Sequence, residues 1–287
     1  MFFGACSLEL VCFLVLGICD FRHKTLRQNH RPLTWAKGPD FSGPNKNMTT
    51  LTLDNLVKSY DGKRVVNSVS LSIENSSVVG LLGPNGAGKT TTFYMTIGMI
   101  KPDMGQVSLG NEDITTCPMY MRARKGIGYL PQETSIFRKL TVKQNILAIL
   151  EILPIDKSNR EDRADMLLDE LGIKHLAGQK ANLLSGGERR RLEISRALAT
   201  NPSFMLLDEP FAGIDPLAVI DIKNIIRHLK KRGIGVLISD HNVRETLEVC
   251  DKAYILNDGE VIESGSPEKI AASETARRIY LGDEFRL

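Results

Sequence analysis

The sequence has few cysteines, and none are spaced as metal ligands. Five occur in 287 residues, three of them within the first 19 positions. Without C-x-x-C pairs, the pattern argues against a zinc site or a disulfide framework as the basis of the fold. We therefore expect a protein of a reducing, cytoplasmic compartment. The cysteines are Cys6, Cys12, Cys19, Cys117 and Cys250.

The sequence also lacks a strong excess of either charge. The formal net charge is +3, and residues 1–47 hold six Lys or Arg against three Asp or Glu, which leaves 31 of each sign in the remainder. Because residues 48–287 have no net charge, they show no excess of basic residues for binding nucleic acid, and we expect no nucleic-acid partner. The share of hydrophobic residues, 42%, is typical of a globular chain with a sizeable core.

Long apolar runs are missing from the first 47 residues. Leu10–Cys19 has ten residues and no Lys or Arg before it, so it is too short to span a bilayer and lacks the basic start of a secretory signal. The polar stretch that follows predicts disorder. Three interpretations of residues 1–47 stay open: a mis-called start with Met48 as the true initiator, a native disordered or weakly membrane-touching extension, and a cleaved signal.

From Met48 onward, short β patterns alternate with helical ones, which predicts an α/β fold with a mostly parallel sheet. Asp258-Gly259 stands between two alternating runs and predicts a hairpin turn. We expect strands at 49–60, 65–73, 77–83, 105–110, 126–131, 203–210 and 235–241, and helices at 90–100, within 142–199 and at 217–231.

The stretch GPNGAGKT at residues 83–90 fits the phosphate-loop pattern G-x-x-x-x-G-K-[ST]. In such a loop, glycines let backbone N–H groups converge on phosphate oxygens, while Lys89 reaches the β and γ phosphates and the Thr90 hydroxyl is offered to magnesium. The motif predicts a site for a nucleoside triphosphate with Mg²⁺. Its expected residues are Gly83, Pro84, Asn85, Gly86, Ala87, Gly88, Lys89, Thr90 and Thr91.

A second motif, FMLLDEP at residues 204–210, is an apolar strand that ends in two carboxylates. Asp208 is placed to hold magnesium through water, and Glu209 can polarise the attacking water as a general base. Acidic residues end many strands, so this motif alone would also fit a structural strand end. Because the same chain contains a phosphate loop, the catalytic interpretation is favoured.

A second glycine loop, LSGGE at residues 184–188, precedes a helix. Ser185 is a good N-cap, and its loop is a second helix start that can bind an anion, although an ordinary capped helix would give the same pattern. With these motifs, residues 50–287 resemble the ATP-binding cassette (ABC) ATPases, whose signature is LSGGE. The resemblance implies a head-to-tail homodimer, in which the signature of one chain covers the γ-phosphate of ATP bound by the other. The signature residues are Ser185, Gly186, Gly187 and Glu188.

The same resemblance implies a domain plan. Residues 48–287 would form an ABC-type P-loop NTPase domain with a RecA-like core and an antiparallel β subdomain. A helical subdomain would be inserted at about 133–195, and a C-terminal tail would run over about 270–287.

Four further positions match the family pattern. By resemblance, Gln132 joins magnesium and the attacking water to the helical subdomain, and His241 contacts the γ-phosphate, so that catalysis involves Gln132, Glu209 and His241. Metal binding would involve Thr90, Gln132 and Asp208. Asp215 would contact the second chain. Tyr60 would stack on adenine, although a packed core tyrosine would also explain it.

Within the family, SIFRKL at residues 135–140 and the terminal YLGDEFRL resemble the ATPases of lipopolysaccharide export. The resemblance implies an ATP hydrolase on the cytoplasmic face of the inner membrane, bound to two integral-membrane permease subunits of the lipopolysaccharide-export type. Phe137 is the candidate permease contact, although a packing role would also fit. The alternatives are the ATPase of a branched-chain amino-acid importer and a non-transport ABC ATPase.

Overall fold

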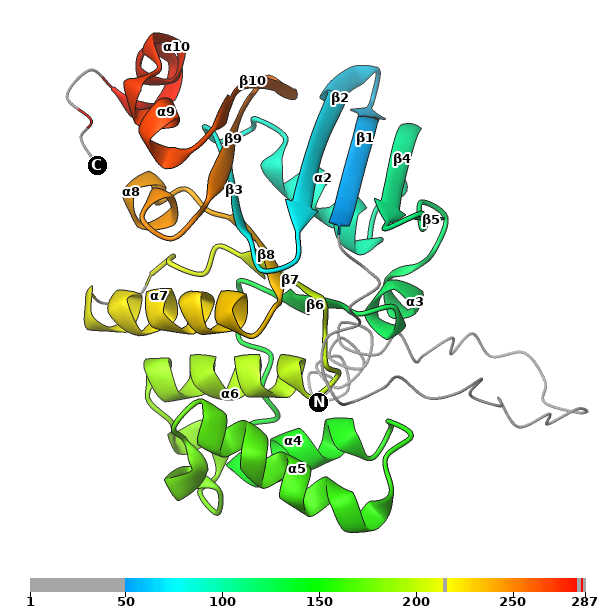
Figure 1. Cartoon of the computed structure of the whole chain (residues 1–287), viewed down its shortest axis with the longest axis vertical. Helices are drawn as coiled ribbons and strands as arrows, with labels where there is room; N and C mark the ends of the chain where they lie inside the picture. Colours follow the sequence, from blue (N-terminus) through cyan, green and yellow to red (C-terminus); the bar gives the residue numbers. More distant parts are fainter. Residues whose placement is uncertain (1–49, 214–215, 283–284, 286–287) are drawn as a thin grey trace, which may run out of the picture.

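The computed structural model describes residues 50–213, 216–282 and 285, and contains two β-sheets packed side by side (Figure 1). The smaller sheet is antiparallel, with strand order β2-β1-β4-β5. Alternate side chains of β1 and β2 are buried, as expected for strands with one face toward a core. The strands are β1 (Thr50–Tyr60), β2 (Lys63–Glu74), β4 (Met104–Leu109) and β5 (Glu112–Asp113).

The larger sheet has the order β10-β9-β3-β8-β7-β6, and all its pairs are parallel except the β9–β10 hairpin. Every residue of β3, β7 and β8 is buried, which explains why these strands are continuous apolar runs. Because parallel strands end at the same edge, the segments after β3, β6, β7 and β8 meet there. The strands are β3 (Val78–Leu82), β6 (Ile127–Leu130), β7 (Phe204–Asp208), β8 (Gly235–Ser239), β9 (Lys252–Asn257) and β10 (Glu260–Gly265).

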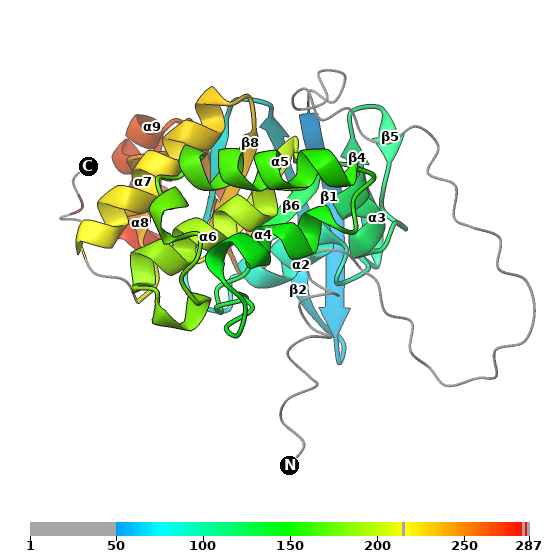
Figure 2. The same cartoon turned by 90° about the horizontal axis from the view of Figure 1, so that it is seen from below.

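Three helices, α4 (Val142–Leu150), α5 (Lys157–Glu170) and α6 (Gly186–Leu198), pack against one another between β6 and β7 in the chain. They lie together at the lower end of the molecule (Figures 1 and 2). Their apolar faces join the larger of two core clusters, and the second core fills the space between the sheets. The short 3-10 turns η1 (Lys174–Leu176) and η2 (Ala181–Leu183) connect α5 to α6.

The remaining helices pack beside the two sheets, and those after β10 form the C-terminal end. They are α2 (Lys89–Ile97), α3 (Met119–Arg124), α7 (Pro216–Lys231), α8 (Val243–Leu247), α9 (Pro267–Ala272), α10 (Glu274–Ala276) and the π-helical turn η3 (Arg277–Leu281). Tyr280, Leu281 and Phe285 pack against the larger core of their own chain. None of the helices in the described ranges is long and apolar enough to cross a bilayer.

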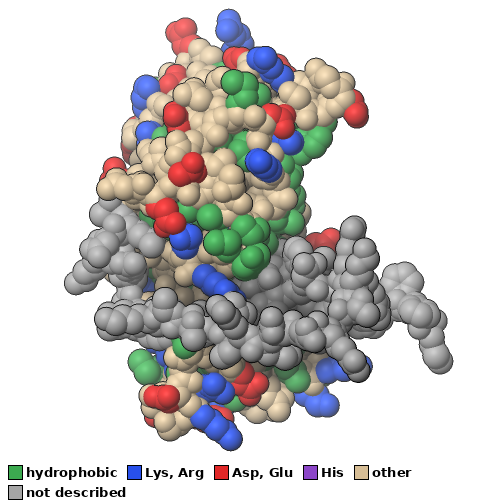
Figure 3. Space-filling model, turned by 90° about the vertical axis from the view of Figure 1, so that its right-hand side faces the viewer, with side chains coloured by type: hydrophobic (Ala, Val, Ile, Leu, Met, Phe, Trp, Pro, Cys, Tyr) green, Lys and Arg blue, Asp and Glu red, His purple; other side chains and the backbone are tan. Residues whose placement is uncertain are grey.

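The surface carries charges of both signs. On the face in Figure 3, Lys and Arg side chains alternate with Asp and Glu, and apolar side chains gather toward the middle. A mixed surface of this kind fits the balanced composition of the body.

The α/β prediction is confirmed, and each expected strand has a counterpart. The helix expected at 90–100 runs from Lys89 to Ile97 instead, because Gly98 adopts a left-handed φ of 83° and caps it. The Asp258-Gly259 hairpin is confirmed, with φ values of 47° and 82°. The expectations for residues 1–47 and Asp215 lie outside the described residues, and the subdomain limits stay predictions.

Candidate active site

The phosphate loop, residues 83–91, joins β3 to α2, and its glycines are placed for different reasons. Gly83, Gly86 and Gly88 all have positive φ. A Cβ on Gly83 would lie 2.1 Å from the Leu256 carbonyl oxygen, and one on Gly88 would lie 2.5 Å from that of Val65. A Cβ on Gly86 would meet nothing within 4 Å. The loop is therefore packed on one side and open at Gly86, where a phosphate can approach the backbone.

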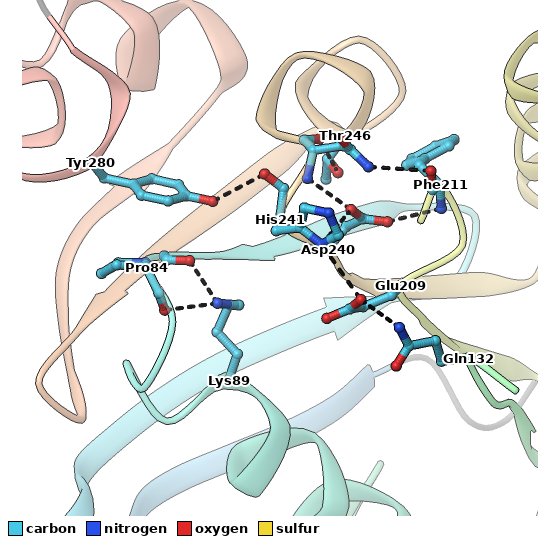
Figure 4. Close-up of polar contacts among 11 residues, drawn as sticks. Pro84, Lys89, Gln132, Glu209, Phe211, Asp240, His241, Thr246 and Tyr280 are labelled. Atoms are coloured by element: carbon cyan, nitrogen blue, oxygen red, sulfur yellow. Dashed lines mark hydrogen bonds and ion pairs between the residues drawn. The ribbon is translucent and has the colours of Figure 1, made fainter. Parts of the chain in front are cut away.

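Lys89 lies over this loop. Its ammonium donates to the carbonyl oxygens of Gly83 at 2.6 Å and Pro84 at 2.9 Å, and the residue is 8% exposed (Figure 4). Burial lowers the pKa of Lys89, although the carboxylates of Glu209 and Asp240 oppose the shift. The arrangement keeps a cation where the phosphates of a nucleotide would add negative charge.

A main-chain contact from the turn after the neighbouring strand β9 supports the loop. The Gly259 N–H donates to the Ala87 carbonyl at 3.1 Å, and the Gly259 carbonyl accepts from the Asn67 N–H at 2.8 Å. The β9–β10 turn is thus part of the site's framework. The sequence predicted this turn but not its contact, because the two segments are far apart along the chain.

Tyr60 ends β1 with 45% of its surface exposed, and the Lys58 ammonium lies 5.6 Å from its ring centre. The neighbouring strand β2 reaches the phosphate loop, since Val65 and Val66 contact the Gly88 position. The ring is thus exposed at the end of a hairpin that touches the loop. Its stacking on adenine stays a prediction.

Asp208 is the last residue of β7, and Glu209 follows it. Asp208 is 6% exposed, and burial, followed by the Glu209 carboxylate, raises the pKa of Asp208 to about 6. The Tyr129 hydroxyl lies 3.4 Å from Asp208 Oδ2, a contact that the sequence did not reveal. A cation beside Asp208 would favour its ionised form.

The structure brings Gln132 and His241 to Glu209 (Figure 4). Gln132 Nε2 donates to Glu209 Oε2 at 2.8 Å, and His241 Nδ1 lies 3.4 Å from the same oxygen. These three residues come from the segments after β6, β7 and β8, so their meeting follows from the strand order. A carboxylate held by an amide and an imidazole at the open edge of the sheet can accept a proton from water.

Within one chain, the signature residues lie apart from this cluster. Ser185 is the N-cap of α6, its N–H donates to Glu188 Oε2 at 2.8 Å, and a capping box is complete. The hydrogen bonds from Ser185 lower the pKa of Glu188. Figure 1 places α6 in the lower part of the molecule and α2 in the upper part. Gly186 and Gly187 begin the helix, so their N–H groups point outward from its first turn.

The residues present fit magnesium bound together with a nucleotide. No group of three or more His, Cys, Asp and Glu side chains within the described ranges is arranged to hold a metal by itself. Mg²⁺ usually keeps waters and takes one or two carboxylates plus substrate phosphates, so Asp208, Gln132 and Thr90 suit it. Thr90 is exposed on the first turn of α2, next to Lys89.

The sequence motifs did not indicate two residues of the site. Asp240 is fully buried directly before His241, and Asn242 follows it; both contact Phe211 in the turn after Glu209. A charged residue at the end of an otherwise apolar strand was the available signal for Asp240. Nothing in the sequence pointed to Asn242.

A phosphate loop after β3, a histidine after the neighbouring strand β8 and an acidic pair at the end of β7, one strand further, define a P-loop ATPase. The chain belongs to the ABC transporter family, whose profile matches residues 66–212.

Known relatives and solved structures support this assignment to the family. The chain is 56% identical over 241 residues to the lipopolysaccharide export system ATP-binding protein LptB of Escherichia coli K12, which covers 84% of this chain and 100% of that protein. A probable ABC transporter ATP-binding protein of Azorhizobium caulinodans is 59% identical over 232 residues, covering 81% of this chain and 83% of that one. The crystal structure of the ADP conformation of MJ1267, an ATP-binding cassette of an ABC transporter, matches with a TM-score of 0.75 and 31% identity over 82% of this chain and 100% of that chain. The predicted family and ATP hydrolase activity are confirmed.

Proposed function

We propose that this chain is the ATPase that powers lipopolysaccharide export, working with two integral-membrane permease subunits of that system. The supporting observation is 56% identity to an ATP-binding protein named for lipopolysaccharide export, over the whole length of that protein. A protein of the same name from Haemophilus influenzae is 55% identical over 241 residues. The branched-chain amino-acid importer is not favoured, since these relatives carry the export name.

In the proposed reaction, Glu209 accepts a proton from the water that attacks the γ-phosphate. Gln132 holds one oxygen of Glu209 at 2.8 Å and orients the carboxylate, while His241 on the next strand end faces the γ-phosphate. Lys89 leaves the carbonyls of its own loop to bind the β and γ phosphates. Asp208, Thr90 and Gln132 would hold magnesium, which would supply neutralising positive charge to the phosphates.

Hydrolysis in this scheme requires two chains. The helix start at Ser185, Gly186 and Gly187 offers N–H groups and a partial positive charge to the γ-phosphate bound by a second copy. Within its own chain it lies apart from the phosphate loop, which supports a site shared between copies (Figure 1). Asp215 is proposed to contact the second chain beside this shared site.

Permease docking is proposed at the segment around Phe137, which follows Gln132. The Arg196 guanidinium lies 5.2 Å from the Phe137 ring centre, and Asn145 holds the Phe137 backbone through bonds of 2.8 and 3.1 Å. The ring is only partly buried, and Arg196, which lies near it, also lines a pocket formed by residues of α3, β6 and α6. Because Gln132 contacts Glu209, the same segment connects the reaction to the membrane partner. The chain would thus lie on the cytoplasmic face of the inner membrane, where ATP is available.

The test is to purify tagged Glu209→Gln protein, held in its ATP-bound state, from detergent-solubilised native membranes, and to identify by mass spectrometry what accompanies it. We expect two permease subunits together with lipopolysaccharide. Recovery of an amino-acid permease would contradict the proposal. Recovery of no membrane protein, from a preparation in which the tagged chain is as abundant as wild type, would also contradict it.

A further inference from the structure

The backbone of Glu209 is in a left-handed conformation, with φ of 43°. A residue with a side chain is uncommon there, and such a conformation persists at a functional site only when surrounding contacts hold it. The Glu209 N–H donates to the Ser239 carbonyl at 2.7 Å, and its carbonyl accepts from Ala212 at 3.2 Å. These bonds fix the peptide groups next to Glu209 but leave Phe211, two residues later, to be held by other contacts.

The loop between β8 and α8 holds both backbone groups of Phe211. Its N–H donates to Asp240 Oδ2 at 2.9 Å, and its carbonyl accepts from Asn242 Nδ2 at 3.2 Å (Figure 4). The second oxygen of Asp240 accepts the Asn242 N–H at 2.7 Å, so the two holding residues are themselves connected. Asp240 has no exposed surface, and Phe211 is 3% exposed.

Asn242 is unusual for its position in the fold. It is the N-cap of α8, a place where Asn normally accepts a hydrogen bond from the helix, but no side-chain cap bond is present. Its amide instead donates to Phe211. The Asn242 side chain therefore stabilises the turn after Glu209 and does not cap the helix.

We propose that Asp240 and Asn242 are positioning residues for Glu209. By clamping Phe211 from both sides, they hold the left-handed turn that directs the Glu209 carboxylate to Gln132 and His241. Since His241 lies between them in the chain, one loop places both the proposed base and the histidine. This inference rests on the proposed role of Glu209 as the base.

Asn242→Ala is the deciding variant, because it removes the bond to the Phe211 carbonyl and leaves the charge of Asp240 in place. We expect kcat for ATP hydrolysis to fall at least about tenfold, with KM for ATP within about twofold of wild type, since a small misplacement of a catalytic group lowers rate rather than binding. Asp240→Asn keeps one acceptor and should show the same split. Because both act on one turn, the double variant should be little slower than the slower single variant.

The control is Asp113→Asn on β5, which removes a carboxylate that also accepts a backbone N–H, from Thr115 at 2.8 Å. Its kcat should stay at the wild-type value. If buried Asp240→Asn does not fold, the half-buried Asn242 still provides the test. Unchanged kcat in Asn242→Ala, or a loss confined to KM or to thermal stability, would overturn the positioning role.

Glu209→Gln, measured beside these variants, separates this inference from the proposed function. If Glu209→Gln is slow and Asn242→Ala is normal, the clamp is wrong and the base assignment stands. If Glu209→Gln turns over normally, the base assignment fails, whatever the clamp variants do. In the Glu209→Gln background, Asn242→Ala should lower the residual rate by less than about twofold; a further tenfold loss would also overturn the positioning role.

Discussion

Gln132 Nε2 donates a hydrogen bond to Glu209 Oε2 at 2.8 Å, across a sequence separation of 77 residues. The contact exists because β6 and β7 are neighbours in the sheet and run in the same direction. Gln132 begins the segment that leads past Phe137 to α4, whereas Glu209 faces the proposed reaction. Gln132 therefore links the Glu209 carboxylate to the segment that contains the proposed permease contact.

Glu209→Gln should lower ATP turnover by at least about a hundredfold, because the amide cannot accept the proton of the attacking water. Nucleotide binding should remain, so gel filtration with ATP should show a stable dimer. The matched control is Glu151→Gln, an exposed glutamate at the end of α4, which should leave the rate unchanged. A fast Glu209→Gln enzyme would exclude Glu209 as the base.

Two glycines of the phosphate loop should respond differently to alanine. Both Gly86→Ala and Gly88→Ala place a side chain at positive φ, at a cost of about 1–2 kcal/mol. Only at Gly88 does the new Cβ also lie 2.5 Å from a carbonyl oxygen. We expect thermal unfolding to show a clearly lower Tm for Gly88→Ala, and a smaller change in Tm with weaker ATP binding for Gly86→Ala. Equal losses of Tm in the two variants would contradict the conclusion that the loop is packed at Gly88 and open at Gly86.

Phe137→Ala should separate nucleotide chemistry from permease binding. The ring lies beside Arg196 outside the nucleotide cluster, so ATP affinity should stay within about twofold of wild type. Recovery of permease subunits from solubilised membranes should fall at least about tenfold, as expected when an aromatic interface residue is removed. Met166→Ala, which removes a 61% exposed side chain on α5, is the control. Full permease recovery with Phe137→Ala would refute this docking site.

Glu170 should make stability depend on pH. Burial tends to raise its pKa, but the contacts from His228 at 2.7 Å and from Arg232 at 2.6 and 2.7 Å outweigh burial, and the pKa of Glu170 is lowered from 4.5. A lowered pKa in the folded state means that the stabilisation is present above pH about 4.5 and is lost as pH falls below it.

Glu170→Gln should therefore reduce the free energy of unfolding by about 1–3 kcal/mol at pH 7, and by less at pH 4. Denaturant titrations at the two pH values provide the measurement. Glu161→Gln, in which the carboxylate paired with Lys143 is 61% exposed, should change stability little at either pH. If the effect of Glu170→Gln on the free energy of unfolding does not become smaller toward pH 4, the proposed link between the Glu170 pKa and stability is wrong.

The sequence by itself determined the local parts of the site. The phosphate loop, the acidic pair and the helix start at Ser185 could be located because glycine spacing, apolar runs and capping residues act over a few neighbouring positions. The hairpin at Asp258-Gly259 was predictable for the same reason. The extent of α2 was not, since Gly98 ends it three residues before the apolar pattern does.

Only the tertiary structure decided which of these parts meet. The contact of Gln132 with Glu209, the support of Ala87 by Gly259 and the clamp of Asp240 and Asn242 on Phe211 all join segments from different strands. They follow from the strand order β9-β3-β8-β7-β6, which brings the ends of distant strands to one edge. That order depends on how the two cores pack in three dimensions, and periodicity along the chain does not encode it.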